Sequence, residues 1–487
     1  MLPPLIRRRQ RNVEYGSRQR GFTMAFVAIT MVAIVSMAAL AIDIGTLYEA
    51  KAEAQRAADA AALAAAQVIS TSGITGDPTN GPTDLSWKAA CGGSASLATL
   101  AANNVANQNL IGGHAPSTIN VYYGISSGVG TITDCTSLGT AFGVNPVVEV
   151  SVQQASLPTF FARVFSLVSG GTFSNSGVSA TAAAEAFNPS GSSPMIPVQP
   201  RCVKPWMVPN RDPGNGTCTT GTCPNFVDPT SGAIRNGGVP ASGGVIGETF
   251  NLIADCQTGP GRRRRCHLIG QPAVTPAGTL QYVPAQTSNT SVAIAANSAI
   301  TGCSKAAEDT NYWNAVAGCD QSTVYACGSA LANTVDLTSD NPGLPGNDSV
   351  YAAQCLINAT NANTSSPITN GQDYLDPAGT PYTYPFQIKA GSNSALTAAG
   401  IAKNSQITSS PSIVSLPIYD NRTSLTLLST TPVTVIGFLQ VFINSVDSAT
   451  GNINVTVMNI AGCGDGSTPP PVALGTSPVP VRLISIP

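Results

Sequence analysis

The chain has 487 residues, only 10% of them charged, and its 23 Lys and Arg against 25 Asp and Glu give a net charge of −2. An average soluble domain carries about 25% charged residues. Because there is no global positive field, a nucleic-acid partner is not expected. Twelve cysteines among so few ionisable groups disfavour an ordinary cytosolic enzyme. The length favours two or more domains, and 43% apolar residues suffice for at least one core.

The first element in the chain is an apolar stretch from Phe22 to Ile42 that contains no charged residue. Its length matches the roughly 20 residues of a membrane-spanning helix and exceeds the apolar core of a signal peptide, about 7–15 residues. Six arginines and one acidic residue precede it. The positive-inside rule therefore predicts a cytoplasmic segment at 1–20, a single transmembrane helix at 21–42, and export of the remaining chain.

The helix is expected to continue beyond the membrane, because Asp43 to Ile69 is rich in alanine, the best helix former. Small side chains form one face of this helix, namely Ala50, Ala54, Ala57, Ala58, Ala61, Ala62, Ala65 and Ala66. Such a face favours close packing against another helix or a sheet. The alternative is a connector helix without a partner. Asp59 is expected either to form an i, i+3 pair with Arg56 or to contact a partner.

The same stretch carries a specific string of residues: Arg20, Gly21, Asp43, Gly45, Tyr48, Gln55, Ala57, Ala58, Asp59, Ala60, Ala61, Ala62 and Leu63. In this string the chain resembles the N-terminal region of TadG-like proteins of Flp (Tad) pilus assembly. The resemblance implies a non-enzymatic protein of the bacterial inner membrane whose partners are Tad/Flp machinery proteins. Gly21-Phe22 also resembles a prepilin cleavage site, although Phe26 stands where pilins usually carry Glu. Cleavage after Gly21 stays open.

The first exported unit is predicted to be a small α+β domain at 43–188. A short helix is expected over 97–110, strands over 119–125, 148–152 and 178–187, and a further helix from Pro158. The ten prolines between residues 189 and 240 predict a linker at 189–242.

The second exported unit, at 243–467, is predicted to be a β-rich sandwich or barrel. A strand is expected over 413–419, and a hairpin is expected from an apolar run at 433–443, a turn at 447–451 and alternation over 453–457. Residues 468–487 are predicted to be a Pro-rich extended tail. The fold class is thus α+β: one transmembrane helix extended into an Ala-rich helix, a small sheet unit, and a β-rich, disulfide-containing ectodomain.

All twelve cysteines follow the apolar stretch: Cys91, Cys135, Cys202, Cys218, Cys223, Cys256, Cys266, Cys303, Cys319, Cys327, Cys355 and Cys463. An even number on the exported side predicts disulfides formed in an oxidising periplasm. The sequence favours four local pairs, Cys91–Cys135, Cys218–Cys223, Cys256–Cys266 and Cys319–Cys327, and leaves the connectivity open. Cys218 and Cys223 are an alternative zinc pair, but His114 and His267 are the only histidines, so no metal or cofactor is expected.

Candidate binding residues are few. Arg262, Arg263, Arg264 and Arg265 form a basic run that predicts either an anion contact or a solvated loop. Asp43 is expected to end the membrane span, with a role in proton transfer as the alternative. No hydrolase, phosphate-binding or dinucleotide motif occurs, and we expect no catalysis. The leading hypothesis is a membrane-anchored, non-enzymatic protein that assists pilus assembly or secretion, and whose long Ala-faced helix docks against components of the machinery. The alternative is a surface adhesin or minor pilin whose β-rich domain binds an extracellular ligand.

Overall fold

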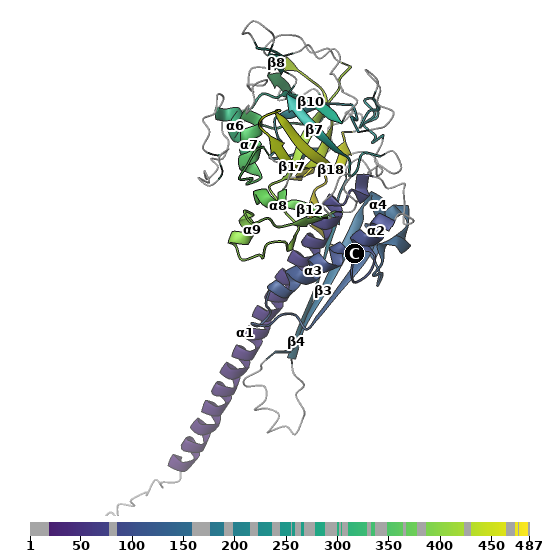
Figure 1. The fold of residues 1–487 in the computed structure, drawn as a ribbon. Helices are drawn as coiled ribbons and strands as arrows, with labels where there is room; N and C mark the ends of the chain where they lie inside the picture. The colour runs from purple at the N-terminus through teal and green to yellow at the C-terminus, as the bar shows by residue number, and fades with distance from the viewer. Residues whose placement is uncertain are drawn as a thin grey trace, which may run out of the picture.

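The computed structural model describes residues 19–76, 85–157, 176–188, 198–214, 223–235, 244–254, 256–258, 264–266, 278–287, 300, 303, 310–328, 333–336, 348–363, 367–376, 386–422, 430–463, 473–475 and 477–485. One long helix extends from a body made of a sheet unit and a barrel (Figure 1). The arginines before residue 19 lie outside the described residues.

The long helix α1 (Gln19–Thr71) contains 53 residues, which corresponds to about 80 Å at 1.5 Å per residue. Its N-terminal half exposes large apolar side chains in every direction, from Phe22 (76% exposed) to Ile42 (54%). By length and composition, it is the one helix in the described part of the chain that can cross a membrane. An apolar surface of this kind is stable in lipid but not in water, which fits single-pass membrane anchoring.

The first unit is an antiparallel sheet in the order β2-β1-β3-β4-β20, packed against the C-terminal half of α1. Its strands are β1 (Thr118–Ile125), β2 (Gly128–Val129), β3 (Pro146–Leu157), β4 (Ser176–Ala186) and β20 (Val481–Ile484). Its shorter helices are η1 (Ile74–Gly76), α2 (Leu85–Cys91), α3 (Leu97–Gln108), η2 (Cys135–Leu138) and α4 (Thr140–Val144). The helix expected from Pro158 lies outside the described residues. The expected helix at 97–110 and the three expected strands are confirmed.

The second unit is a closed barrel in the order β10-β6-β15-β17-β18-β7. Its strands are β6 (Trp206–Pro209), β7 (Thr249–Ala254), β10 (Thr279–Pro284), β15 (Ile413–Tyr419), β17 (Val435–Asp447) and β18 (Asn452–Gly462). The expected hairpin is confirmed as β17 and β18, which pair antiparallel. β6 lies within residues 189–242, the range expected to be a linker. It forms part of the barrel wall instead, and its residues Trp206, Met207 and Val208 are fully buried there.

The remaining elements surround the barrel. The strands are β5 (Val198–Pro200), β8 (Cys256–Thr258), β9 (Arg264–Cys266), β11 (Thr334–Asp336), β12 (Tyr374–Asp376), β13 (Gln387–Lys389), β14 (Gln406–Ile407), β16 (Thr430–Pro432) and β19 (Ala473–Gly475). The helices are α6 (Thr310–Ala317), α7 (Asp348–Leu356), α8 (Pro367–Asn370) and α9 (Ala395–Ala398).

A lysine caps the C-terminal end of α6, where helix carbonyls lack internal partners. Lys204 Nζ donates to Gly318 O at 2.5 Å.

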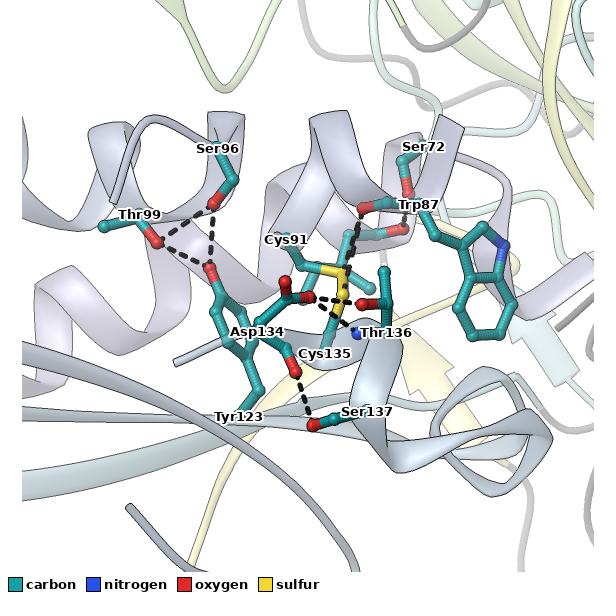
Figure 2. The surroundings of a disulfide bond; sticks show 11 residues. Ser72, Trp87, Cys91, Ser96, Thr99, Tyr123, Asp134, Cys135, Thr136 and Ser137 are labelled. Carbon is teal, nitrogen blue, oxygen red and sulfur yellow. Dashed lines mark hydrogen bonds between the residues drawn. A yellow bond between two sulfur atoms is a disulfide. The ribbon is translucent and has the colours of Figure 1, made fainter. Parts of the chain in front are cut away.

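Four disulfides join described cysteines: Cys91–Cys135, Cys202–Cys319, Cys303–Cys355 and Cys327–Cys463. The expected Cys91–Cys135 pair is confirmed; it ties α2 to η2 beneath the buried Trp87 (Figure 2). The expected Cys319–Cys327 pair is wrong, because each of these cysteines bonds a residue more than a hundred positions away.

The other two expected pairs stay predictions. Cys218 lies outside the described residues, and Cys223 is disulfide-bonded. Cys256 and Cys266 are backbone register partners between β8 and β9.

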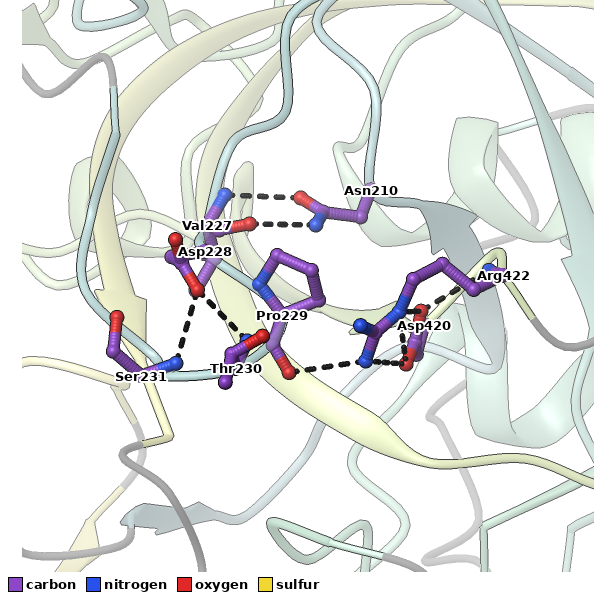
Figure 3. A network of polar contacts seen from close by, with 8 residues as sticks. All are labelled: Asn210, Val227, Asp228, Pro229, Thr230, Ser231, Asp420 and Arg422. Atoms are coloured by element: carbon purple, nitrogen blue, oxygen red, sulfur yellow. Dashed lines mark hydrogen bonds and ion pairs between the residues drawn. The ribbon is translucent and has the colours of Figure 1, made fainter.

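A polar network lies where the barrel strands β6 and β15 end, directly before Asn210 and Asp420 (Figure 3). The Asn210 amide makes two hydrogen bonds to the backbone of Val227, at 2.6 and 2.9 Å. Asp228 accepts from the backbone N–H groups of Thr230 and Ser231, and these bonds, together with Arg235, hold the pKa of its carboxyl well below the usual value. Arg422 bridges Asp420 and the carbonyl of Pro229. The loop after β15 is therefore fixed to the loop around residue 229.

The C-terminal segment returns to the first unit instead of extending as a free tail (Figure 1). Val479 is fully buried in the core that α1 shares with β3 and β4, and its carbonyl accepts from Ser70 Oγ at 2.7 Å. Arg482 of β20 pairs with Glu185 of β4 and lies 4.9 Å from the ring centroid of Phe187. Residues 477–485 thus complete a sheet that begins more than 350 positions earlier.

A buried polar joint connects the two units at the end of α1. Asn459 of β18 donates to Ser70 O and to Thr75 Oγ1, and Asn188 donates to Thr75 O and to Ile460 O. Gly73 has φ +77°, and a Cβ there would approach Ile246 Cγ2 to 2.3 Å. Because buried hydrogen bonds are directional, this joint fixes the barrel relative to the helix that leads to the membrane.

A buried carboxyl pair makes the stability of the barrel depend on pH. Asp212 is fully buried and Glu248 is 8% exposed. Burial, then the hydrogen bond and charge of Asp212, raise the pKa of Glu248 to about 9. The folded chain therefore holds a proton that the unfolded chain releases above a pKa of about 4.3. This contribution to stability is full below about pH 4 and is lost as the pH rises toward 9, with a slope of up to about 1.4 kcal/mol per pH unit.

We expect Glu248→Gln to flatten this slope between pH 5 and pH 6, as measured by urea unfolding of the oxidised protein. The window avoids Lys204, whose pKa burial lowers to about 7, because the opposite effect of that lysine, stability rising with pH, sets in about one pH unit below that pKa. Glu49→Gln, at an exposed carboxyl of α1, is the control and should keep the parent slope. An unchanged slope in Glu248→Gln would contradict the assignment.

Candidate functional site

The alanine face of α1 is covered by the chain itself. Ala54, Ala57, Ala58, Ala61, Ala62, Ala65 and Ala66 are all fully buried. They form one core with the inward residues of β3 and β4 and with α3. The alanines allow the helix axis to approach the sheet closely, as small residues do at tight interfaces. This face therefore packs internally, and the expectation that it docks against machinery components is wrong for these residues.

The other residues of the N-terminal string lie in three different environments. Gly45 and Tyr48 are exposed: no atom comes within 4 Å of a Cβ built at Gly45, and Tyr48 is 75% exposed. Asp43 is 2% exposed, and Leu63 is partly buried against the core. Arg20 and Gly21 begin the helix, at positions whose side chains are not described. The outward surface of α1 near the membrane thus consists of Gly45, Tyr48 and their neighbours.

The polar side of α1 faces the outer edge of β4. Lys51 Nζ donates to the carbonyl of Ser179, and Gln55 Nε2 donates to the carbonyl of Thr181 at 3.3 Å. Gln55 Nε2 also donates to Asp59 Oδ1 at 2.8 Å, one helical turn further on. Asp59 is therefore held by Gln55, and no ion pair between Asp59 and Arg56 occurs in the described structure. The string places Gln55 and Asp59 together beside a strand edge.

A cavity of about 570 Å³ opens at this edge, where β20 ends. Gln55 and Asp59 of α1 line it together with Glu149 of β3, Thr181 of β4 and Leu483 of β20. Burial raises the pKa of the Glu149 carboxyl. Leu483 is 44% exposed at the rim. The cavity thus combines two carboxyl groups, an amide and strand backbone, and the described residues that line it include no cation.

Sequence reasoning found Gln55 and Asp59 but did not find Glu149 or Thr181 as residues that line the same cavity. The alternation of β3 places Glu149 on the face opposite to Val148, Val150 and Val152, but no sequence pattern relates it to residue 59. Arg262 and Arg263 lie outside the described residues, while Arg264 and Arg265 form part of β9. The proposed anion contact therefore stays a prediction. Among the described residues, no group of three His, Cys, Asp or Glu is placed to hold a metal ion.

Residues 21–68 match the family model described as Putative Flp pilus-assembly TadE/G-like. The match covers the apolar half of α1 and all of its alanine face, and the resemblance of the N-terminal region is confirmed. No curated protein and no solved structure matches the chain significantly. The matched stretch contains Gln55 and Asp59 and excludes the sheet strands, the barrel and the described disulfides.

Proposed function

We propose that this chain is a non-enzymatic, single-pass protein of the bacterial inner membrane that assists the assembly of Flp (Tad) pili. The observation that carries the proposal is the match of residues 21–68 to the TadE/G-like pilus-assembly family. The N-terminus would lie in the cytoplasm and the sheet unit and barrel in the periplasm, because basic residues precede the span and the bonded cysteines follow it.

Three structural features indicate that the body is held rigidly to the membrane helix and is not a domain on a flexible tether, and this rigidity supports an assembly role. α1 runs from the span into the core of the first unit without a break. The joint around Asn188 and Asn459 then fixes the barrel to the end of that helix. The C-terminal strand β20 closes the same sheet. A body held in this way keeps one orientation to the membrane, which suits a protein that must present a surface to a machine in the same bilayer.

Deleting the gene and counting surface pili by electron microscopy tests the proposal. We expect piliation to fall at least tenfold, with recovery when the full chain is supplied from a plasmid. A truncated chain that keeps residues 1–76 only is the control for the span and should not restore pili. Unchanged pilus numbers and unchanged secretion in the deletion strain would exclude an assembly role.

The alternative of a minor pilin makes a different prediction for sheared cells. Cleavage after Gly21 would give material in the pilus fraction whose N-terminus is Phe22. Retention of the full-length chain in the membrane fraction supports the anchored protein proposed here. N-terminal sequencing of both fractions distinguishes the two functions.

A further inference from the structure

The outer edge of β4 is paired along only part of its length. β3 pairs with β4 from Gln154↔Val178 to Val147↔Glu185. On the other edge, β20 pairs only with Ala183–Ala186. Among the described residues, no strand pairs with this outer edge at Ser179–Ala182. An edge of this kind offers backbone donors and acceptors to another strand.

In the part of the chain that the structure describes, side chains cover the edge at Ser179 and Thr181. The carbonyls of Ser179 and Thr181 accept from Lys51 and Gln55, which lie one turn apart on α1. Charged and polar side chains that cover an edge discourage unselective strand pairing. Both covering side chains are long and end in rotatable groups, so the N–H groups of an incoming strand can replace them at the same carbonyls.

The two carboxyl groups of the cavity lie on opposite faces of the sheet, Asp59 on α1 and Glu149 on β3, the strand that pairs with the inner edge of β4. Ala180 and Ala182 face α1 and belong to the core, so Asp59 lies on that side. Thr181 faces the other side, where its hydroxyl bonds Ser151 at 3.3 Å. Glu149 lies between Val148 and Val150, which also face α1, and therefore points to the same side as Thr181. Consecutive side chains of an added strand would point alternately to the face of Asp59 and to the face of Glu149, and a long side chain on the second face would have to reach across β4 to Glu149.

We propose that the β4 edge at Ser179–Ala182 binds an extended segment of a partner protein by strand addition, and that two consecutive basic residues of this segment contact Asp59 and Glu149. The choice of occupant follows from charge complementarity, since the cavity holds two carboxyl groups and its described lining has no cation. The chain already uses this pairing once, where Arg482 of β20 contacts Glu185 of β4 across the same edge. The inference extends the proposed function by stating the chemistry of the partner.

Peptide binding to the full-length oxidised chain in phosphatidylcholine nanodiscs tests this inference. The probe is a fluorescent eight-residue peptide of alternating Thr and Val with a central Arg-Lys pair. One control peptide carries Glu-Glu at the centre, and another keeps Arg-Lys but is N-methylated at both central amides. We expect micromolar to millimolar binding of the probe, and at least tenfold weaker binding of each control peptide. N-methylation removes the backbone donors without changing the charge.

Two protein variants test whether Asp59 and Glu149 bind the basic peptide, or whether any acidic residue on the surface would do so. The double variant Asp59→Asn/Glu149→Gln should bind the basic peptide at least tenfold more weakly, whereas Glu49→Gln, an exposed acid on the same helix, should bind within twofold of the parent. Thermal melting confirms that each variant is folded. Equal binding of the N-methylated peptide, equal binding by the double variant, or no binding of the probe would overturn the inference.

The alternative occupant of this edge is a second copy of this chain. Concentration-dependent dimerisation that is lost in the double variant would assign the edge to self-association and overturn the proposal of a partner segment. Peptide binding is measured without pili, so its failure leaves the deletion test of the proposed function independent. Conversely, normal piliation of the deletion strain would leave the peptide result standing.

Discussion

Removing the Cys327–Cys463 disulfide should cause the largest loss of barrel stability of any single bond in the described chain. The bond closes 136 residues, a longer stretch than the other three described disulfides close. In the chain-entropy description, a loop of this length contributes about 5 kcal/mol by restricting the unfolded state. Cys463 follows the last residue of β18 directly, so the bond ties the end of a central barrel strand to the segment before β11.

The paired variant Cys327→Ser/Cys463→Ser is compared with the parent by scanning calorimetry under oxidising conditions. We expect the barrel transition to lose about 2–5 kcal/mol, the usual range for the removal of a native disulfide. Cys91→Ser/Cys135→Ser is the matched control, because that bond lies in the sheet unit. It should lower the transition of the sheet unit and leave the barrel transition in place. A barrel transition that does not move in the first variant contradicts the prediction.

Enlarging the alanine face of α1 should separate the helix from its sheet. Ala58 and Ala62 are fully buried, one turn apart, in the core shared with β3 and β4. Leucine at either position adds three carbons where the packing leaves no room, and such overpacking costs about 1–3 kcal/mol at each site. We expect Ala58→Leu/Ala62→Leu to lower the stability of the sheet unit by several kcal/mol and to make β4 more accessible to protease.

The matched control for this variant is Ala52→Leu, since Ala52 is exposed on the same helix. Leucine has nearly the helix propensity of alanine, so the control changes volume without a large loss of helix stability. It should melt within about 0.5 kcal/mol of the parent. If the double leucine variant also melts like the parent, α1 does not pack on the sheet through these alanines.

Local patterns were enough to predict much of this fold. The apolar run at 22–42 and the alanines that follow it predicted one long helix, because helix propensity and apolar length depend only on neighbouring residues. Alternation predicted β1, β3, β4, β15 and the β17–β18 hairpin for the same reason. The pattern could not distinguish a sandwich from a closed barrel, since closure depends on β6, β7 and β10 meeting across long separations.

The cysteines show where local reasoning fails. Proximity in sequence gave the correct partner for Cys91, which lies 44 positions from Cys135. It gave the wrong partner for Cys319, which bonds Cys202 across 117 positions. Both loops are entropically permitted, because the cost of loop closure grows only with the logarithm of the length. The choice between them is made by the packing of the barrel, which sequence spacing does not encode.

The sequence by itself determined the apolar membrane-spanning stretch, the low charge of the chain that follows it, and the two residues of the N-terminal string that reach the candidate site, Gln55 and Asp59. Only the tertiary structure decided what surrounds them. The helix buries its alanines against its own sheet, so the surface left for a partner is the polar flank and the β4 edge. Residues 479–485 lie on the first unit, beside that edge, because Val479 gains burial and β20 gains backbone pairing there. A site assembled from residues 55, 149, 181 and 483 depends on contacts between distant parts of the chain, and these form only when the whole chain folds.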